Sequence, residues 1–227
     1  VVKENKKVKK LGVLPVIEPS WEKLSGAPLE YMMVERGFER STLEEWEFGY
    51  DPISDRVVIP IWDDQGKLVG AKGRSYKGEK LRYITLGNKQ GREDRYDFDT
   101  VPIGELVYGI HKCDSEKPIV VEGELNVASA WQKYTPAVGI SGGYMSETQA
   151  EQIIRYFDGV VLMFDDDEAG HRATMRGLEL LEPYIDVAIA PLFPKDANEM
   201  LDTELRDQVQ CSQSPLEWRL QLERETI

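Results

Sequence analysis

The second half of the sequence alternates short apolar segments with segments of helical periodicity. The apolar segments have the length of buried strands, and the expected strands are residues 118–123, 136–141, 159–165 and 186–192. The expected helices are residues 124–134, 146–157, 168–183 and 196–209. The second of these helices opens with a capping box made by Ser146 and Gln149. Because strands connected through helices pair in parallel, this alternation predicts a parallel sheet covered by helices on both faces.

Residues 28–115 show a different pattern, which predicts a smaller mixed α+β subdomain. The expected elements are helices at 28–38 and 41–48, a hairpin at 55–76 and a further strand at 80–87. Ser41 is the expected N-cap of the second helix. The polar segment HKCDSEKP ends in a proline and marks the boundary between the halves, near residues 110–117. The chain as a whole is therefore predicted to be α+β, with an α/β second half.

The two ends of the chain are expected to lie outside these units. Five of the first ten residues are lysines, and we interpret residues 1–27 as a linker or N-terminal extension. Residues 116–209 form the predicted α/β domain. Residues 210–227 fit either a short helix that packs back on the domain or a linker, and the linker is the preferred interpretation.

Charge is distributed unevenly along the chain. The net charge of −13 by itself argues against a nucleic-acid partner. However, residues 1–110 hold 18 basic and 19 acidic side chains, whereas residues 111–227 hold 10 and 22. Residues 67–95 hold nine basic side chains and three acidic ones. The net charge is therefore compatible with a basic patch beside an acidic half.

Composition also bears on the cellular setting. No apolar stretch reaches the roughly 18 residues that would span a bilayer, so no membrane partner is expected. Cys113 and Cys211 belong to no CxxC motif, which predicts neither a disulfide framework nor a structural zinc site. A reducing, cytoplasmic setting fits this pattern best.

Acidic residues follow three of the four expected strands in the second half. They are Glu122 after the first strand, Asp165 and Asp167 after the third, and Asp196 after the fourth. Ligands of an open parallel sheet bind beyond the carboxyl ends of its strands, so these carboxylates are expected to meet. Side chains alternate along an extended segment, which would direct Asp165 and Asp167 to one side and Asp166 to the other. Clustered carboxylates repel one another, and oxygen ligands of this kind select Mg²⁺ or Mn²⁺.

Other interpretations of the acids remain open on this pattern. An acidic turn, or a helix N-terminus stabilised by its dipole, has the same composition. Haloacid-dehalogenase phosphatases also place a DxD motif after a strand, although theirs is DxDxT or DxDxV on the first strand. Nucleotide-sugar transferases use DxD as well, but no other segment here resembles their fold.

Three motifs in the second half resemble the Toprim domain, which is shared by DnaG-type primases, topoisomerases of types IA and II, and some nucleases. They are VVEGE, LMFDDDEAG and PKDANEML, and the similarity covers residues 116–203. The form FDxDxAGxxA is similar to the primase branch, and KDANE to phage primase–helicases. In the first half, DRVVIPIWDDQGKLVGAKGR, LRYITLG and LVYGI resemble the segment that precedes Toprim in DnaG-type primases. Topoisomerases and nucleases lack that segment.

The resemblance implies roles for the matching residues. Glu122 would be a metal ligand or the base for a 3′-hydroxyl, Asp165 and Asp167 would bind metal, and Asp196 would serve a further ion. Arg74 and Arg82 would face template or nucleotide phosphates, with Lys72 and Lys80 as weaker candidates. Solvated strand positions are the alternative for these four basic residues.

Two positions depart from the family pattern. Asn126 stands where the family commonly has aspartate, which removes one negative charge and puts a third metal in doubt. Arg82 replaces a lysine, so the compact ammonium group becomes a planar guanidinium with several N–H donors.

The resemblance therefore implies a DNA primase core. It would make RNA primers on single-stranded DNA from ribonucleoside triphosphates by two-metal nucleotidyl transfer, in a bacterial or phage-infected cell. A zinc-binding module and a replicative helicase would be its protein partners. A Toprim nuclease and a non-catalytic module that binds single-stranded DNA are the alternatives; Asn126 favours the second of these.

Overall fold

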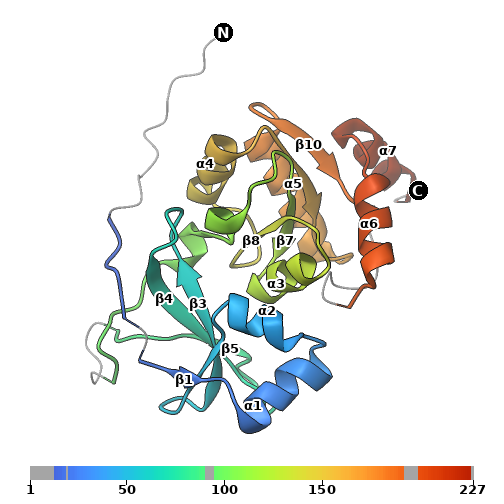
Figure 1. The fold of residues 1–227 in the computed structure, drawn as a ribbon. Coiled ribbons are helices and arrows are strands. Elements are labelled where there is room, and N and C mark those ends of the chain that lie inside the picture. Colours follow the sequence, from blue (N-terminus) through green and yellow to red (C-terminus); the bar gives the residue numbers. More distant parts are fainter. Residues whose placement is uncertain (1–12, 19, 90–94, 192–198, 226–227) are drawn as a thin grey trace.

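The computed structural model describes residues 13–18, 20–89, 95–191 and 199–225 (Figure 1). It contains two five-stranded sheets, one built mainly from each half of the chain. The predicted fold class, a helix-flanked parallel sheet preceded by a smaller α+β unit, is confirmed. None of the helices in the described part of the chain combines the length and apolar character that a bilayer crossing requires.

The first sheet is antiparallel throughout, with its strands in chain order. Its strands are β1 (Glu22–Lys23), β2 (Gly49–Asp51), β3 (Arg56–Trp62), β4 (Leu68–Arg74) and β5 (Tyr83–Thr85). The predicted hairpin is present as β3 and β4, with a bulge at Ile61 and Trp62. Strands β1 and β2 were not predicted, because two or three residues are too few to show alternation.

Short helical segments accompany the first sheet. They are α1 (Gly26–Glu30), the π-helical segment η1 (Tyr31–Glu35), α2 (Arg40–Glu45), and the 3₁₀ turns η2 (Ile103–Glu105) and η3 (Ile110–Lys112). The helix predicted over 28–38 is therefore divided into α1 and η1. The prediction that Ser41 caps the next helix is wrong: α2 begins at Arg40, and Glu39 occupies the N-cap position.

The second sheet has the strand order β10-β9-β7-β8-β6. Its strands are β6 (Val107–Tyr108), β7 (Ile119–Glu122), β8 (Ala137–Ile140), β9 (Gly159–Met163) and β10 (Asp186–Ile189). The four predicted strands are parallel, as expected, and only β6 is antiparallel. Strand β6 comes from within residues 28–115, so the second sheet takes an edge strand from the segment that precedes the expected boundary.

Helices cover both faces of the second sheet (Figure 1). They are α3 (Glu124–Gln132), α4 (Glu147–Tyr156), α5 (Glu168–Leu181), α6 (Asp202–Gln210) and α7 (Pro215–Glu225). The capping box of Ser146 and Gln149 is confirmed at the start of α4. The predicted start of the last helix in 196–209 falls in residues 192–198, which lie outside the described residues.

Trp46 joins the two halves of the molecule. It follows α2, is fully buried, and packs 5.2 Å from the ring of Tyr108 in β6. The rings of Trp62 in β3 and Trp131 in α3 lie 6.2 and 6.1 Å from it. In Figure 1, α2 accordingly lies between the first sheet and α3. One apolar core therefore includes residues of both sheets, which holds them in a single arrangement.

The preference for a linker over residues 210–227 is wrong. Helix α7 packs against the second sheet, and Trp218 is only 2% exposed among residues of the core beneath α5 and β10. One buried tryptophan is sufficient to dock the helix. The sequence did not reveal this, because a single aromatic residue shows no periodicity.

We expect Trp218→Ala to lower the free energy of unfolding by about 3 kcal/mol, since it leaves a large cavity under α7. Leu216→Ala, at a position that is 66% exposed on the same helix, should change it by less than about 0.5 kcal/mol. Urea denaturation of both variants measures the difference. Equal effects would show that α7 is not docked through Trp218.

A second prediction concerns His111, whose ring lies 5.2 Å from that of Trp62. Burial and the nearby Lys112 lower the pKa of His111 to about 4. The unfolded chain therefore binds a proton at higher pH than the folded chain does. The free energy of unfolding should decrease as pH falls from about 6.5 towards 4, by up to about 1.4 kcal/mol per pH unit. His111→Phe should flatten this part of the unfolding free energy against pH, whereas an unchanged slope would contradict the prediction.

Candidate active site

A pocket of about 530 Å³ lies between the carboxyl ends of strands in the second sheet and strands β4 and β5 of the first. Its lining carboxylates are Glu122, Glu124, Asp165 and Glu199, and its lining cations are Arg36, Lys72, Arg74 and Arg82. The acids come from the second half of the chain and the cations from the first. The fold thus places acids of the second half and cations of the first half in one cavity.

The three aspartates that follow β9 make different contacts. Strand β9 ends at Met163, two residues earlier than predicted, so Asp165 to Asp167 form a turn rather than a strand end. Asp165 lines the pocket. Asp167 is the N-cap of α5 and accepts the backbone N–H of Gly170 at 2.7 Å, while Asp166 lies 3.5 Å from His171.

The glycine of the LMFDDDEAG motif, Gly170, is required by close packing of the backbone. A Cβ atom at that position would fall on the carbonyl oxygen of Asp165. Only glycine therefore allows the first turn of α5 to pack directly against the backbone of Asp165. This packing fixes the backbone of Asp165, whose side chain lines the pocket.

Glu122 ends β7 and lines the same pocket. Asn126, one turn further into α3, donates its side-chain amide to the backbone carbonyl of Glu122 at 3.0 Å. A carboxylate has no proton to donate at neutral pH, so the aspartate that the family commonly has could not make this bond. The departure at Asn126 therefore has a local structural role beside Glu122.

Lys72 and Glu124 form an ion pair across the pocket, with Lys72 Nζ 2.6 Å from Glu124 Oε1. Glu124 is 3% exposed at the start of α3 and also accepts the hydroxyl of Ser141, which follows β8. Lys72 comes from β4, so the pair connects the two sheets. Glu124 was not predicted from the sequence, where it is only the second acid of VEGE.

Arg74 is buried between two tyrosines. Its Nε and Nη2 donate to the hydroxyl of Tyr31 at 3.0 and 2.9 Å, and its Nη1 donates to the hydroxyl of Tyr83. Burial raises the pKa of Tyr83, so its hydroxyl stays protonated and can donate in turn. Arg74 thus orients Tyr83, which lines the pocket.

The guanidinium groups of Arg36 and Arg82 have no hydrogen bond or ion pair with any of the described residues. Both line the pocket, and the Nε of Arg36 is buried without a partner in that part of the chain. Arg36 was not predicted, because a single basic residue at the end of a helical segment is common. Lys80 is exposed and does not line this pocket, and Asp196 lies outside the described residues.

The pocket fits a hard divalent cation through its donor chemistry, since its acids supply oxygen ligands only. Glu122 and Asp165 are the residues that would hold the ion, because they lie at the carboxyl ends of β7 and β9 and line the pocket. Within the described ranges, which omit residues 192–198, no three acidic, histidine or cysteine side chains are grouped closely enough to bind a metal.

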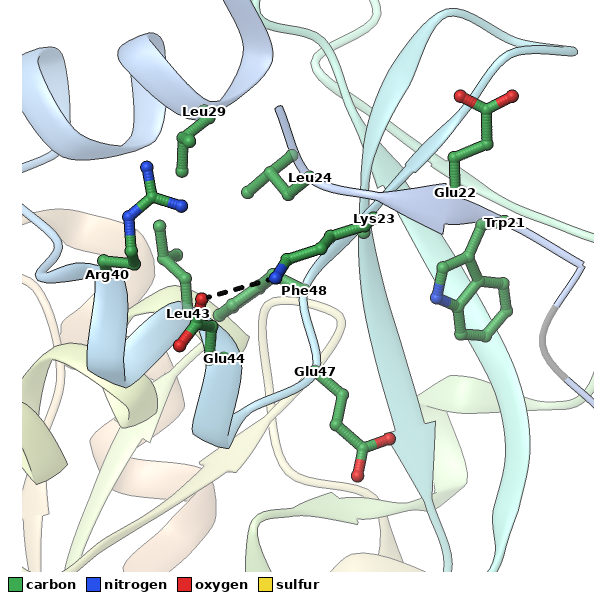
Figure 2. Close-up of a pocket in the computed structure, with 11 residues that line it drawn as sticks. Trp21, Glu22, Lys23, Leu24, Leu29, Arg40, Leu43, Glu44, Glu47 and Phe48 are labelled. Carbon is green, nitrogen blue, oxygen red and sulfur yellow. Dashed lines mark ion pairs between the residues drawn. The ribbon is translucent and has the colours of Figure 1, made fainter. Parts of the chain in front are cut away.

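A second pocket, of about 260 Å³, lies beside β1, α1 and α2 (Figure 2). Its lining includes Leu24, Leu43 and Phe48, and Glu44 there lies 3.7 Å from Lys23. None of the residues predicted for the site lines it. This pocket therefore carries none of the predicted chemistry.

Comparisons with known proteins agree with this fold. A family model described as Toprim-like matches residues 119–201. A DNA primase of Borreliella burgdorferi is 30% identical over 163 residues, which are 68% of this chain and 29% of the relative. A DNA primase of Deinococcus radiodurans is 34% identical over 137 residues, which are 57% of this chain and 22% of the relative. The chain thus spans less than a third of the length of these curated relatives.

Solved structures share the fold over most of the chain. A DnaG primase catalytic domain bound to ssDNA superposes with a TM-score of 0.68 at 17% identity, covering 82% of this chain and 71% of that one. The zinc-binding and RNA polymerase domains of the Aquifex aeolicus primase give a TM-score of 0.71 at 21% identity, covering 87% and 58%.

The fold is that of a Toprim-like parallel sheet preceded by an antiparallel sheet. By sequence the chain is related to bacterial DNA primases, and it shares the fold of DnaG primase catalytic domains.

The Lys72–Glu124 pair leads to a testable prediction. Glu124→Gln should lower the free energy of unfolding by about 3 kcal/mol, because it leaves the ammonium of Lys72 partly buried and uncompensated. Adding Lys72→Met should recover much of that loss. Chemical denaturation of both single variants and the double variant measures the coupling, and additive losses would contradict it.

Proposed function

We propose that this chain is the catalytic core of a DNA primase that joins ribonucleotides on a single-stranded DNA template. The observation that carries the proposal is the pocket itself, in which Glu122 and Asp165 of the second sheet face Arg36 and Arg82 of the first half. Acids that can hold a cation, and guanidinium groups that no described residue neutralises and that can bind phosphates, suit nucleotidyl transfer.

The roles of the basic residues follow from their partners. Arg36 and Arg82 would bind phosphates of the nucleotide or template, because the described residues do not already neutralise them. Lys72 and Arg74 would act less directly, through Glu124 and through the tyrosine hydroxyls. Tyr83 would donate its hydroxyl to a phosphate or sugar oxygen.

Glu122 is the proposed proton acceptor. In the reaction the 3′-hydroxyl oxygen would bond to the α-phosphorus of the incoming nucleotide, pyrophosphate would leave, and Glu122 would take the hydroxyl proton. A bound Mg²⁺ or Mn²⁺ would supply charge neutralisation for the phosphates and acidify that hydroxyl. Asp165 would help to hold the ion, while the metal-binding roles of Asp167 and Asp196 stay predictions.

The wider biological setting is also part of this proposal. The ssDNA in one related structure and the zinc-binding domain in another suggest the same partners for this chain. A replicative helicase is a further proposed partner, and the KDANE motif supports a phage-type origin.

The test is extension of a short RNA primer annealed to single-stranded DNA, with labelled ribonucleotides and either Mg²⁺ or Mn²⁺. The chain should add nucleotides, and EDTA should stop the reaction. Glu122→Gln and Asp165→Asn should each reduce the rate at least about a hundredfold, because they remove the base or a ligand charge. Circular dichroism confirms that each variant is folded.

Asp166→Asn is the matched control, since it changes an acid of the same turn that lies beside His171. It should retain most of the activity. Shortening of the primer or template would indicate the Toprim nuclease instead. Binding of single-stranded DNA without synthesis would indicate the non-catalytic module.

A further inference from the structure

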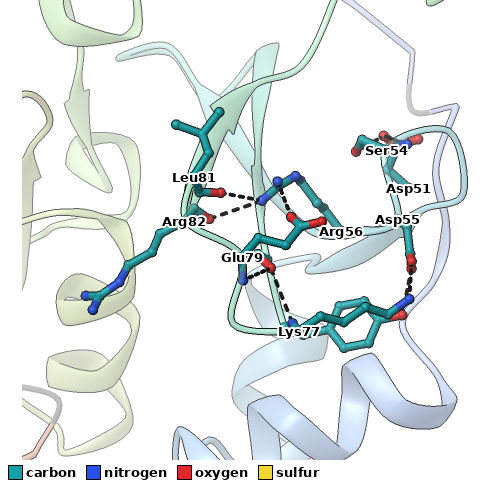
Figure 3. Close-up of polar contacts among 10 residues, drawn as sticks. Asp51, Ser54, Asp55, Arg56, Lys77, Glu79, Leu81 and Arg82 are labelled. Carbon is teal, nitrogen blue, oxygen red and sulfur yellow. Dashed lines mark hydrogen bonds and ion pairs between the residues drawn. The ribbon is translucent and has the colours of Figure 1, made fainter.

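Arg56, at the start of β3, reaches the segment that connects β4 to β5. Its Nη1 donates to the backbone carbonyls of Leu81 and Arg82 at 3.0 and 3.3 Å, and its Nη2 pairs with the carboxylate of Glu79 (Figure 3). The side chain of Arg56 is buried and does not line the pocket. Its guanidinium is therefore committed to the backbone and one acid of this segment, residues 75–82, which we call the β4–β5 loop.

Asp55, the neighbouring residue, holds the other end of the β4–β5 loop. Its carboxylate accepts the hydroxyl of Tyr76 at 2.6 Å and pairs with the ammonium of Lys77. The hydrogen bonds from Lys77, Tyr76 and Tyr50 lower the pKa of Asp55 to about 2. Two consecutive residues thus bind both ends of the same loop.

The point where the loop enters β5 is held by two donors. The carbonyl of Arg82 accepts the backbone N–H of Ser75 at 2.9 Å as well as the contact from Arg56. The side chain of Arg82 leaves this fixed backbone and lines the pocket. Ordering a long cationic side chain costs conformational entropy. Because the backbone of Arg82 is already fixed, less of this entropy is lost when Arg82 binds a ligand.

We propose that Arg56 is a positioning residue for Arg82. It holds the backbone of Arg82 so that the guanidinium of Arg82 enters the pocket ready to bind a phosphate of the template strand. This inference rests on the proposed function, because it assumes that Arg82 contacts nucleic acid.

The competing explanation is that Arg56 only stabilises the first sheet. A purely structural residue would affect unfolding, and its effect on binding would not depend on Arg82. A positioning residue acts through Arg82, so its effect on binding should disappear once the side chain of Arg82 is removed.

The experiment measures binding of a fluorescent single-stranded oligothymidylate by anisotropy at low salt. The variants are Arg56→Lys, Arg82→Ala and the double variant. Lysine keeps the charge of Arg56 but lacks the fork that reaches three acceptors, so loss of binding cannot be attributed to lost charge. Arg56→Lys should raise Kd about fivefold, which corresponds to about 1 kcal/mol. In the Arg82→Ala background it should change Kd by less than about twofold.

Two further variants sharpen the test. Arg219, on helix α7, also pairs with a glutamate, Glu182. Arg219→Lys is therefore a matched control, and it should leave Kd unchanged. Glu79→Ala removes a negative charge from the β4–β5 loop, so attraction of the template to net charge alone predicts tighter binding. Loss of the contact to Arg56 predicts weaker binding instead. This variant also keeps the inference testable if Arg56→Lys is unfolded.

The outcomes separate this inference from the proposed function. Weaker binding in Arg56→Lys that vanishes in the double variant supports it, as does weaker binding in Glu79→Ala. Equal losses in both backgrounds, no loss at all, or tighter binding in Glu79→Ala would overturn it while leaving the primase proposal intact. No binding of single-stranded DNA by the unaltered chain would instead count against the proposed function.

Discussion

The packing of Trp46 between the two halves is the contact on which the rest of the site depends. Its ring lies against Tyr108, Trp62 and Trp131, which come from β6, β3 and α3. Lys112 adds to this junction, with its ammonium 5.1 Å from the centre of the Trp46 ring and a 2.9 Å hydrogen bond to the carbonyl of Glu45. Because buried aromatic side chains interlock tightly, the two sheets have one relative position, and the pocket between them has one shape.

That fixed position brings opposite charges together at a short distance. The acids of the second sheet would repel one another without compensation, and the cations of the first half supply part of it. The Lys72–Glu124 pair is one of these contacts, and its two charges largely neutralise each other. Arg36 and Arg82 have no partner among the described residues and could bind phosphates, while Glu122 and Asp165 line the same pocket as oxygen donors.

Part of the site could be predicted from the sequence, and the limit has a physical reason. Glu122 is the last residue of β7 and Asp165 follows β9, and the carboxyl ends of neighbouring parallel strands lie at the same edge of the sheet. The tasks of Lys72 and Arg74 could not be predicted, because their partners, Glu124 and the tyrosines at 31 and 83, are distant in sequence or belong to other elements. The cap that Asp167 forms at the start of α5 was not predicted either, and its role in metal binding stays a prediction.

The sequence by itself determined the parallel sheet, the hairpin and the uneven distribution of charge, since these depend on the periodicity and composition of neighbouring residues. The motifs were also sufficient to indicate the family. Only the tertiary structure decided which cations are already paired, that α7 docks through Trp218, and that β6 joins the second sheet. Each of these depends on contacts between residues far apart in the chain, and neither local periodicity nor local charge records which distant side chains will meet.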